Sequence, residues 1–308
     1  MDSFYGIALI PVVVAAIGAV GFWLFLSRRE GVPRSTARTT TAVGSAFALV
    51  VAIGYLLFGA EPFWLNSTTI DALSTVLDLR FMFPLVLGIV VLVVLAFPAR
   101  RQGTVGPAEL SRRTPLSFAR PWWLIVLGVL LLVALGLALA AGFASRPDDQ
   151  GHYTMFRVEL GTASAGTTIY GWFYSVPCLI LLAVTVAVMA ADLAVISRPA
   201  LALDRNKDIA VRRVRALNVV RVGTGAVLMH LSAVLGSLAG TSSLYATFGQ
   251  TGTSTLGEVS VGTSFAALTT SLQVGSWVAM VLGFAFWFST LLSVIPTPLR
   301  TRRRADFA

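Results

Sequence analysis

Cysteine, lysine and histidine are nearly absent from this chain of 308 residues. A single cysteine, Cys178, excludes an internal disulfide and any metal site built from several cysteines. His230 has no cysteine, second histidine or carboxylate in its own apolar segment that would complete a metal or haem site, and the other histidine, His152, lies in a loop. No P-loop, His-Glu-x-x-His or Gly-x-Ser-x-Gly motif occurs. We therefore expect no enzyme activity and no bound cofactor.

Charged residues are also scarce, at 12% of the chain compared with roughly 25% in an ordinary soluble domain. Hydrophobic residues make up 56%, and the mean hydropathy is +0.82. One buried core cannot produce such a value, because it requires several segments whose whole circumference faces lipid or other helices. Arginine used almost to the exclusion of lysine is typical of a high-GC bacterial genome. The composition therefore predicts a multi-pass protein of a bacterial plasma membrane.

Seven segments are long and apolar enough to cross a hydrocarbon core about 30 Å thick. They cover residues 4–27, 41–60, 81–99, 122–144, 168–196, 217–240 and 271–296. The first differs from a cleaved signal peptide because its basic residues, Arg28 and Arg29, follow the apolar run instead of preceding it. The sequence thus predicts an all-α membrane protein in which residues 1–308 form one polytopic domain of seven transmembrane helices.

The basic residues alternate strictly between the two sides of these segments. Twenty lie in or beside the loops around residues 28–40, 100–120 and 198–221 and in the tail after residue 299, whereas three lie in the other loops. The positive-inside rule therefore places the N-terminus outside and the C-terminus in the cytoplasm. We interpret the arginine clusters as topogenic charge that contacts anionic lipid headgroups, because no aromatic-interleaved basic patch indicates a nucleic-acid partner.

The first three and the last three segments share short motifs. Tyr-Gly followed by Pro occurs at 5–11 and 170–177, Val-Gly-Ser or Val-Gly-Thr at 43–45 and 222–224, and Leu-Val-Leu-Gly or Met-Val-Leu-Gly at 85–88 and 280–283. With residues 122–144 as a connector, this indicates a 3+1+3 parallel repeat; chance matches between apolar segments are the alternative. Parallel repeats of this topology occur in transporters such as the SWEET sugar carriers. The Pro-Gln pair of that wider family is absent, since Pro11 precedes Val12 and Pro177 precedes Cys178.

The segment 168–196 carries the clearest set of polar residues within a span. At 100° per residue they fall within an arc of roughly 80°; they are Tyr170, Tyr174, Cys178, Thr185 and Asp192. One interpretation is the lining of a solute path. The other is a set of helix-packing residues, with the tyrosines in an outer aromatic belt and Asp192 near the cytoplasmic headgroups. Because an unpaired charge in a membrane is unfavourable, we expect Asp192 to have a partner, with Arg221 as the first candidate.

Two further features lie in the segment 217–240. His230 is the one histidine within a span, and we interpret it as a hydrogen-bonded interior residue, with a proton-responsive role as the alternative. Gly236 and Gly240 have the spacing of small residues that allows close helix contact, with the segment 41–60 as the expected neighbour.

The two long outer loops, residues 145–167 and 241–270, are polar and rich in Gly, Ser and Thr. Alternating residues at 153–159 and 258–262 predict short strands that form an external hairpin or cap. A disordered connector is the alternative.

Two functional hypotheses remain. The first is a small-solute carrier with a path between the two three-helix halves, and the second is a non-catalytic subunit or scaffold that contacts other membrane proteins. A carrier requires a polar cavity near the middle of the membrane, reached from one side. A scaffold is expected to be packed solid at that depth.

Overall fold

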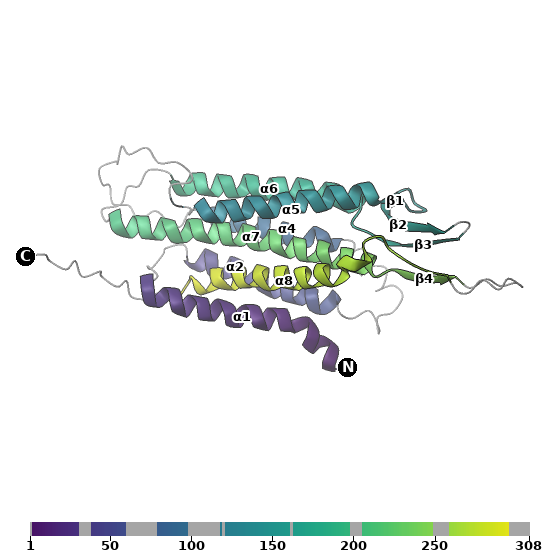
Figure 1. Ribbon diagram of the computed structural model, residues 1–308. Helices are drawn as coiled ribbons and strands as arrows, with labels where there is room; N and C mark the ends of the chain where they lie inside the picture. Colours follow the sequence, from purple (N-terminus) through teal and green to yellow (C-terminus); the bar gives the residue numbers. More distant parts are fainter. Residues whose placement is uncertain are drawn as a thin grey trace, which may run out of the picture.

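The computed structural model of the chain describes residues 2–30, 38–59, 79–97, 118, 121–160, 163–197, 205–248 and 259–295. Within these ranges seven α-helices lie alongside one another, and short strands gather at one end of the bundle (Figure 1). The helices are α1 (Asp2–Glu30), α2 (Arg38–Gly59), α4 (Phe83–Ala96), α5 (Pro121–Ala144), α6 (Trp172–Ser197), α7 (Arg205–Ser242) and α8 (Thr269–Leu292). Two 3-10 turns, η1 (Leu79–Phe81) and η3 (Ala266–Leu268), precede α4 and α8.

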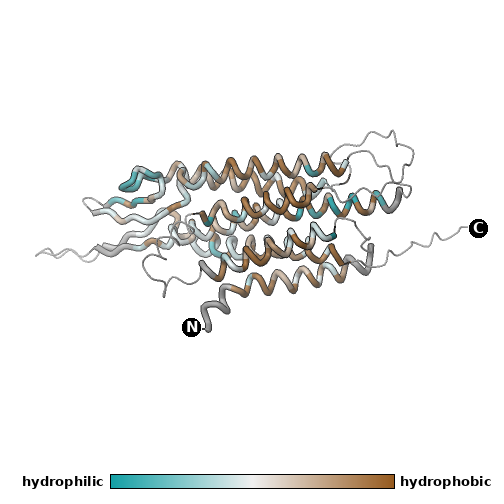
Figure 2. Tube along the Cα trace, turned by 180° about the vertical axis from the view of Figure 1, so that it is seen from behind, coloured by the Kyte–Doolittle hydropathy of each residue, from teal (hydrophilic) through white to brown (hydrophobic). Residues whose placement is uncertain are grey.

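Each of the seven predicted segments contains a helix. Five helices, α2, α5, α6, α7 and α8, are long and apolar enough to cross a membrane, while α1 and α4 supply the shorter apolar stretches Leu9–Phe25 and Phe83–Ala96. Hydrophobic residues dominate the middle of the bundle, and hydrophilic residues gather toward the strands and at one end of α7 (Figure 2). The chain therefore has the features of a multi-pass integral membrane protein.

Two helix starts differ from those expected. α7 begins at Arg205 rather than at residue 217, because a charged extension, stabilised by the ion pair between Arg212 Nε and Asp208 Oδ2 at 2.8 Å, continues the helix beyond its apolar part. α6 begins at Trp172 rather than at 168, because Thr168 still pairs with Met155 in a strand. Hydropathy reports burial in lipid and does not detect either boundary.

The predicted strands are confirmed in both loops, residues 145–167 and 241–270, within the described residues. β2 (Tyr153–Leu160) pairs antiparallel with β3 (Ala163–Thr168), and β1 (Arg146–Pro147) adds to the other edge of β2. A second hairpin joins β4 (Tyr245–Phe248) to β5 (Val259–Gly262). The two loops touch each other, since the rings of Phe156 and Phe265 meet edge to face with centroids 5.5 Å apart.

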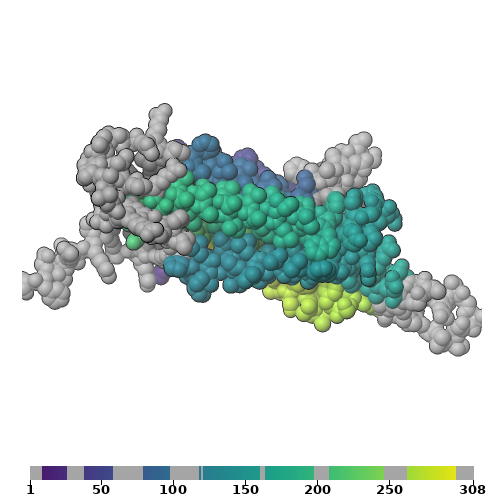
Figure 3. Space-filling model, turned by 90° about the horizontal axis from the view of Figure 1, so that it is seen from above, coloured from purple at the N-terminus to yellow at the C-terminus, as the bar shows by residue number. Residues whose placement is uncertain are grey.

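Six helices are neighbours in a closed order: α1, α2, α4, α6, α7, α8 and back to α1. Additional contacts join α4 to α7 and α2 to α8, while α5 packs outside this ring against α6 and α7. α5 and α6 together cover one face of the molecule (Figure 3). The ring has a two-fold pattern of neighbours. If α1 is exchanged with α6, α2 with α7 and α4 with α8, every pair of neighbouring ring helices becomes another neighbouring pair.

The helices of the ring differ greatly in length. α4 has 14 residues and is therefore about 21 Å long, whereas the 38 residues of α7 extend about 57 Å. α4 nevertheless packs closely: a Cβ atom on Gly88 would lie 2.4 Å from the Cβ of Ala226 in α7. Because α4 is so short, its first turn begins inside the bundle and not level with the strands.

Arginines of α7 join the ends of three other helices at the opposite pole from the strands. Arg212 donates a hydrogen bond to the carbonyl of Ile196 in α6, Arg215 to Leu95 in α4 at 3.4 Å, and Arg221 to Ser289 in α8 at 3.5 Å. A helix C-terminus has carbonyls without intrahelical partners and a partial negative charge, so cations there are favourable. The α7 arginines thus tie α4, α6 and α8 together in addition to defining a basic surface.

Candidate functional site

All seven residues singled out in the sequence are buried. Their exposed fractions are at most 8%; they are Tyr170, Tyr174, Cys178, Thr185, Asp192, Arg221 and His230. The four that lie on α6 share its buried stripe, as their spacing predicted. None of the seven, however, lines the cavity described below. The structure therefore places the predicted polar stripe in the packed interior.

Three of these residues form a socket for Phe81 of η1, which is completely buried. The Phe81 ring lies with its centroid 4.7 Å from that of Tyr170 and 5.2 Å from that of Tyr174. Nδ1 of His230 lies 2.8 Å from the Phe81 carbonyl oxygen. Because a carbonyl can accept but not donate, the hydrogen bond places the proton on Nδ1. His230 is thus a hydrogen-bonded interior residue that fixes η1.

Asp192 has a different charged neighbour from the one expected. The nearest influence of a cation on it comes from the charge of Arg215, whereas Arg221 donates to the Ser289 carbonyl of α8, and the described residues give no ion pair between Asp192 and either arginine. Arg221 follows Arg215 by six positions, so the two side chains point about 120° apart around α7 and only one can face α6. Asp192 is 2% exposed, and its Oδ2 accepts no hydrogen bond from the described part of the chain.

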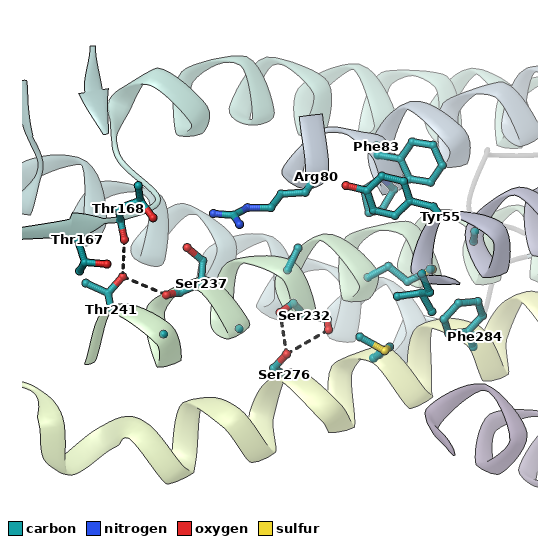
Figure 4. A pocket seen from close by; sticks show the side chains of 18 residues that line it. Tyr55, Arg80, Phe83, Thr167, Thr168, Ser232, Ser237, Thr241, Ser276 and Phe284 are labelled. Atoms are coloured by element: carbon teal, nitrogen blue, oxygen red, sulfur yellow. Dashed lines mark hydrogen bonds between the residues drawn. The ribbon is translucent and has the colours of Figure 1, made fainter. Parts of the chain in front are cut away.

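A cavity of about 680 Å³ lies between α2, α4, α7 and α8 on the strand side of the bundle (Figure 4). On α7 it runs from Met229 to Thr241, a length of about 18 Å along the helix. It therefore reaches from the strand end to near the middle of the bundle. Its lining residues are Ala52, Tyr55, Leu56, Arg80, Phe83, Pro84, Thr167, Thr168, Met229, Ser232, Ala233, Gly236, Ser237, Gly240, Thr241, Ser276, Met280 and Phe284.

Arg80 is the charged residue of this lining, and its guanidinium points toward the hydroxyl groups of Thr168 and Ser237 (Figure 4). Its Cζ lies 4.7 Å from the centroid of the Phe81 ring, close enough for a cation–π contact. Within the described residues its guanidinium makes neither a hydrogen bond nor an ion pair. The socket therefore fixes Phe81, which directly follows Arg80, the one charged residue among the described residues of this lining.

Hydroxyl groups line the strand end and the α7–α8 wall of the cavity. Thr241 Oγ1 donates to the carbonyl of Thr168 at 2.9 Å and lies 3.0 Å from that of Ser237. Ser276 Oγ donates to the carbonyl of Ser232 at 2.8 Å (Figure 4). Toward the middle of the bundle the lining is apolar, with stacked rings of Tyr55 and Phe83 whose centroids are 4.3 Å apart. The cavity thus has a polar end and an apolar end.

The glycines of α7 have roles other than the predicted one. A Cβ on Gly240 would meet open space, and one on Gly236 would meet only Ser276 Oγ at 3.2 Å, so both glycines line the cavity instead of joining α7 to α2. Close helix contact occurs about three turns deeper than Gly236, where a Cβ on Gly283 of α8 would lie 3.1 Å from the carbonyl oxygen of Gly225. Trp287 packs there with its Nε1 donating to the Val222 carbonyl at 3.2 Å. This contact closes the α7–α8 interface below the cavity.

Two features of the sequence indicate the cavity but were not among the predicted site residues. Arg80 is one of the three basic residues on the side of the predicted spans where basic residues are otherwise rare. Small and hydroxyl residues recur every three or four positions on the outer half of α7, at 232–233, 236–237 and 240–241. Because these side chains are small, they leave the space beside this face of α7 unfilled.

Comparison with known proteins gave no significant match to a family model, to a curated protein or to a solved structure. The functional argument therefore rests on the geometry of this chain.

Proposed function

We propose that this protein is a seven-span, small-solute carrier of the bacterial plasma membrane, with the cavity between α2, α4, α7 and α8 as its substrate site. The observation that carries the proposal is a cavity of about 680 Å³ with polar and apolar parts that reaches the middle of an apolar bundle. Sites for small molecules commonly have volumes of roughly 300–1,000 Å³ and a few polar groups in a mostly apolar lining.

The distribution of charge supports an outward-facing cavity. The arginines of α7 lie at the pole opposite the strands, and the positive-inside rule assigns that pole to the cytoplasm. The cavity begins at the strand end, beside Thr168 and Thr241. Its inner side ends at the contact of Gly225 with Gly283 and Trp287. In this orientation the substrate enters from outside, and the α7–α8 contact is the inner gate.

The helix neighbours support a path between two halves. Two helices of the cavity, α2 and α4, belong to the first three-helix group, and the other two, α7 and α8, belong to the second. These pairs exchange under the same swap that maps the helix ring onto itself. An internal parallel repeat of this kind would let one half rock against the other around a central site. A scaffold subunit has no need of such a cavity, so the carrier hypothesis is the better supported of the two.

Cysteine accessibility tests the carrier proposal. In a Cys178→Ala background, Ala233→Cys places a thiol on the cavity wall, and the impermeant reagent MTSET is applied to intact cells and to inverted membrane vesicles. A carrier that alternates its access predicts reaction from both sides. Thr290→Cys is the matched control, because Thr290 is fully buried in α8 below the cavity and is expected to stay unreactive to external reagent. Reaction of Ala233→Cys from one side alone would contradict transport by alternating access.

A further inference from the structure

We propose that the cavity selects an organic anion with an apolar body, whose acidic group pairs with Arg80. This inference names the substrate class of the site under the proposed function and so rests on that function. It follows from the charge of the cavity lining, its hydrogen-bond donors and its apolar end.

Positive charge dominates the part of the lining that the structure describes. Arg80 is the sole charged residue among these eighteen residues, which include no Asp or Glu. A guanidinium is always protonated, and in a partly apolar site it is stabilised by an anion that accepts its fixed fork of donors. Because Arg80 has no protein acceptor in the described part of the chain, its donors are available to a ligand.

Additional groups around Arg80 favour an anion. The hydroxyl groups of Thr168 and Ser237 lie where its guanidinium points, and each can donate to the same acidic oxygens (Figure 4). These donors would hold a carboxylate or phosphate at the polar end.

The other end of the cavity requires an apolar body on the same ligand. The stacked Tyr55 and Phe83 rings stand there with Leu56, Met280 and Phe284. An inorganic anion bound to Arg80 would leave this surface uncovered, whereas an aryl or alkyl group would fill it and gain hydrophobic contact. A ligand with both features comes either from the external solution, as a free organic acid, or from the bilayer, as an anionic lipid.

Binding measurements on the purified chain in phosphatidylcholine nanodiscs test the proposal. The probe is 4-phenylbutyrate, and its amide serves as a neutral control of nearly equal shape. We expect the acid to bind at least tenfold more tightly than the amide, Arg80→Gln to abolish that preference, and Arg80→Lys to retain part of it. Arg157→Gln, which removes an exposed arginine of β2 outside the cavity, is the matched control and should change nothing.

Two more measurements distinguish a free organic acid from an anionic lipid as the ligand and test whether a loss of binding is caused by misfolding. Gly240→Leu fills the cavity without altering Arg80, so it should also abolish binding of the probe while thermal stability is retained. In nanodiscs that contain phosphatidylglycerol, displacement of the probe by lipid and loss of bound lipid in Arg80→Gln would identify an anionic lipid as the ligand. Equal binding of acid and amide, unchanged binding by Arg80→Gln, or no binding of either the probe or phosphatidylglycerol would overturn the inference. Failure of alternating access at Ala233→Cys, with anion binding intact, would overturn only the carrier function.

Discussion

Nδ1 of His230, in the middle of α7, lies 2.8 Å from the carbonyl oxygen of Phe81 in the turn before α4. Replacing His230 by Ala removes the donor and leaves the buried carbonyl without a partner, a change that costs about 1–3 kcal/mol. We expect lower thermal stability and weaker 4-phenylbutyrate binding although His230 does not line the cavity, since Arg80 adjoins the anchored residue. His230→Asn, which keeps a donor, should lose less. His152→Ala, in the exposed outer loop, is the control; equal effects of both alanine variants would refute the positioning role.

Glycines at open and at crowded positions should respond in opposite ways to alanine. Gly88→Ala would place a Cβ 2.4 Å from the Ala226 Cβ, which cannot move without its backbone, and we expect a loss of about 1–3 kcal/mol. Gly240→Ala meets open space and reduces backbone freedom, so its thermal stability should be unchanged or slightly higher. Melting curves in detergent compare the two variants. A stable Gly88→Ala protein would contradict the close α4–α7 packing.

The charged neighbour of Asp192 can be identified by a double-mutant cycle. Asp192→Asn combined with Arg215→Gln should show a coupling free energy of about 1 kcal/mol, because the positive charge of Arg215 acts on the Asp192 carboxylate. The cycle with Arg221→Gln should show a coupling near zero, since Arg221 contacts the α8 carbonyl of Ser289. Unfolding of the purified variants gives both values. Stronger coupling to Arg221 would restore the pairing first expected from the sequence.

Asp148 lies in the outer loop and should respond to pH. Although partial burial acts to raise its pKa, hydrogen bonds from the His152 N–H, the Thr154 hydroxyl and the Gln150 N–H together hold the pKa below its ordinary value of 3.8. The carboxylate therefore stabilises the loop above pH 4, and this stabilisation is lost as the pH falls through the lowered pKa. Asp148→Asn should increase hydrogen exchange of residues 148–154 at pH 6, and the difference should diminish as the pH falls below 3.8 through the lowered pKa. A difference independent of pH would exclude the carboxylate as its cause.

The orientation can be tested at two exposed positions at opposite poles of the bundle. In the Cys178→Ala background, an impermeant maleimide applied to intact cells should label Asp149→Cys, in the loop between β1 and β2, and not Arg213→Cys, in the charged start of α7. Permeabilised cells provide the control, since both thiols should then react. Labelling of Arg213→Cys alone in intact cells would reverse the proposed topology and place the cavity on the cytoplasmic side.

Local patterns along the chain located the seven helices and two of the strands but not the starts of α6 and α7, because burial in lipid and alternation in a strand depend on neighbouring residues. The apolar segments all contain helices, and the alternation at 153–159 marks β2. The buried stripe of α6 also followed from helical spacing, and Tyr174, Cys178, Thr185 and Asp192 are indeed buried.

What the stripe contacts was decided only by the tertiary structure. Two helices with known faces can still pack in many rotations and depths, so spacing could not show that Tyr170 and Tyr174 enclose Phe81, or that Arg215 and not Arg221 faces Asp192. The cavity depends on the same kind of information. It exists because the short α4 begins inside the bundle, leaving Arg80 beside the small residues of α7, and no single segment of the sequence contains that relation.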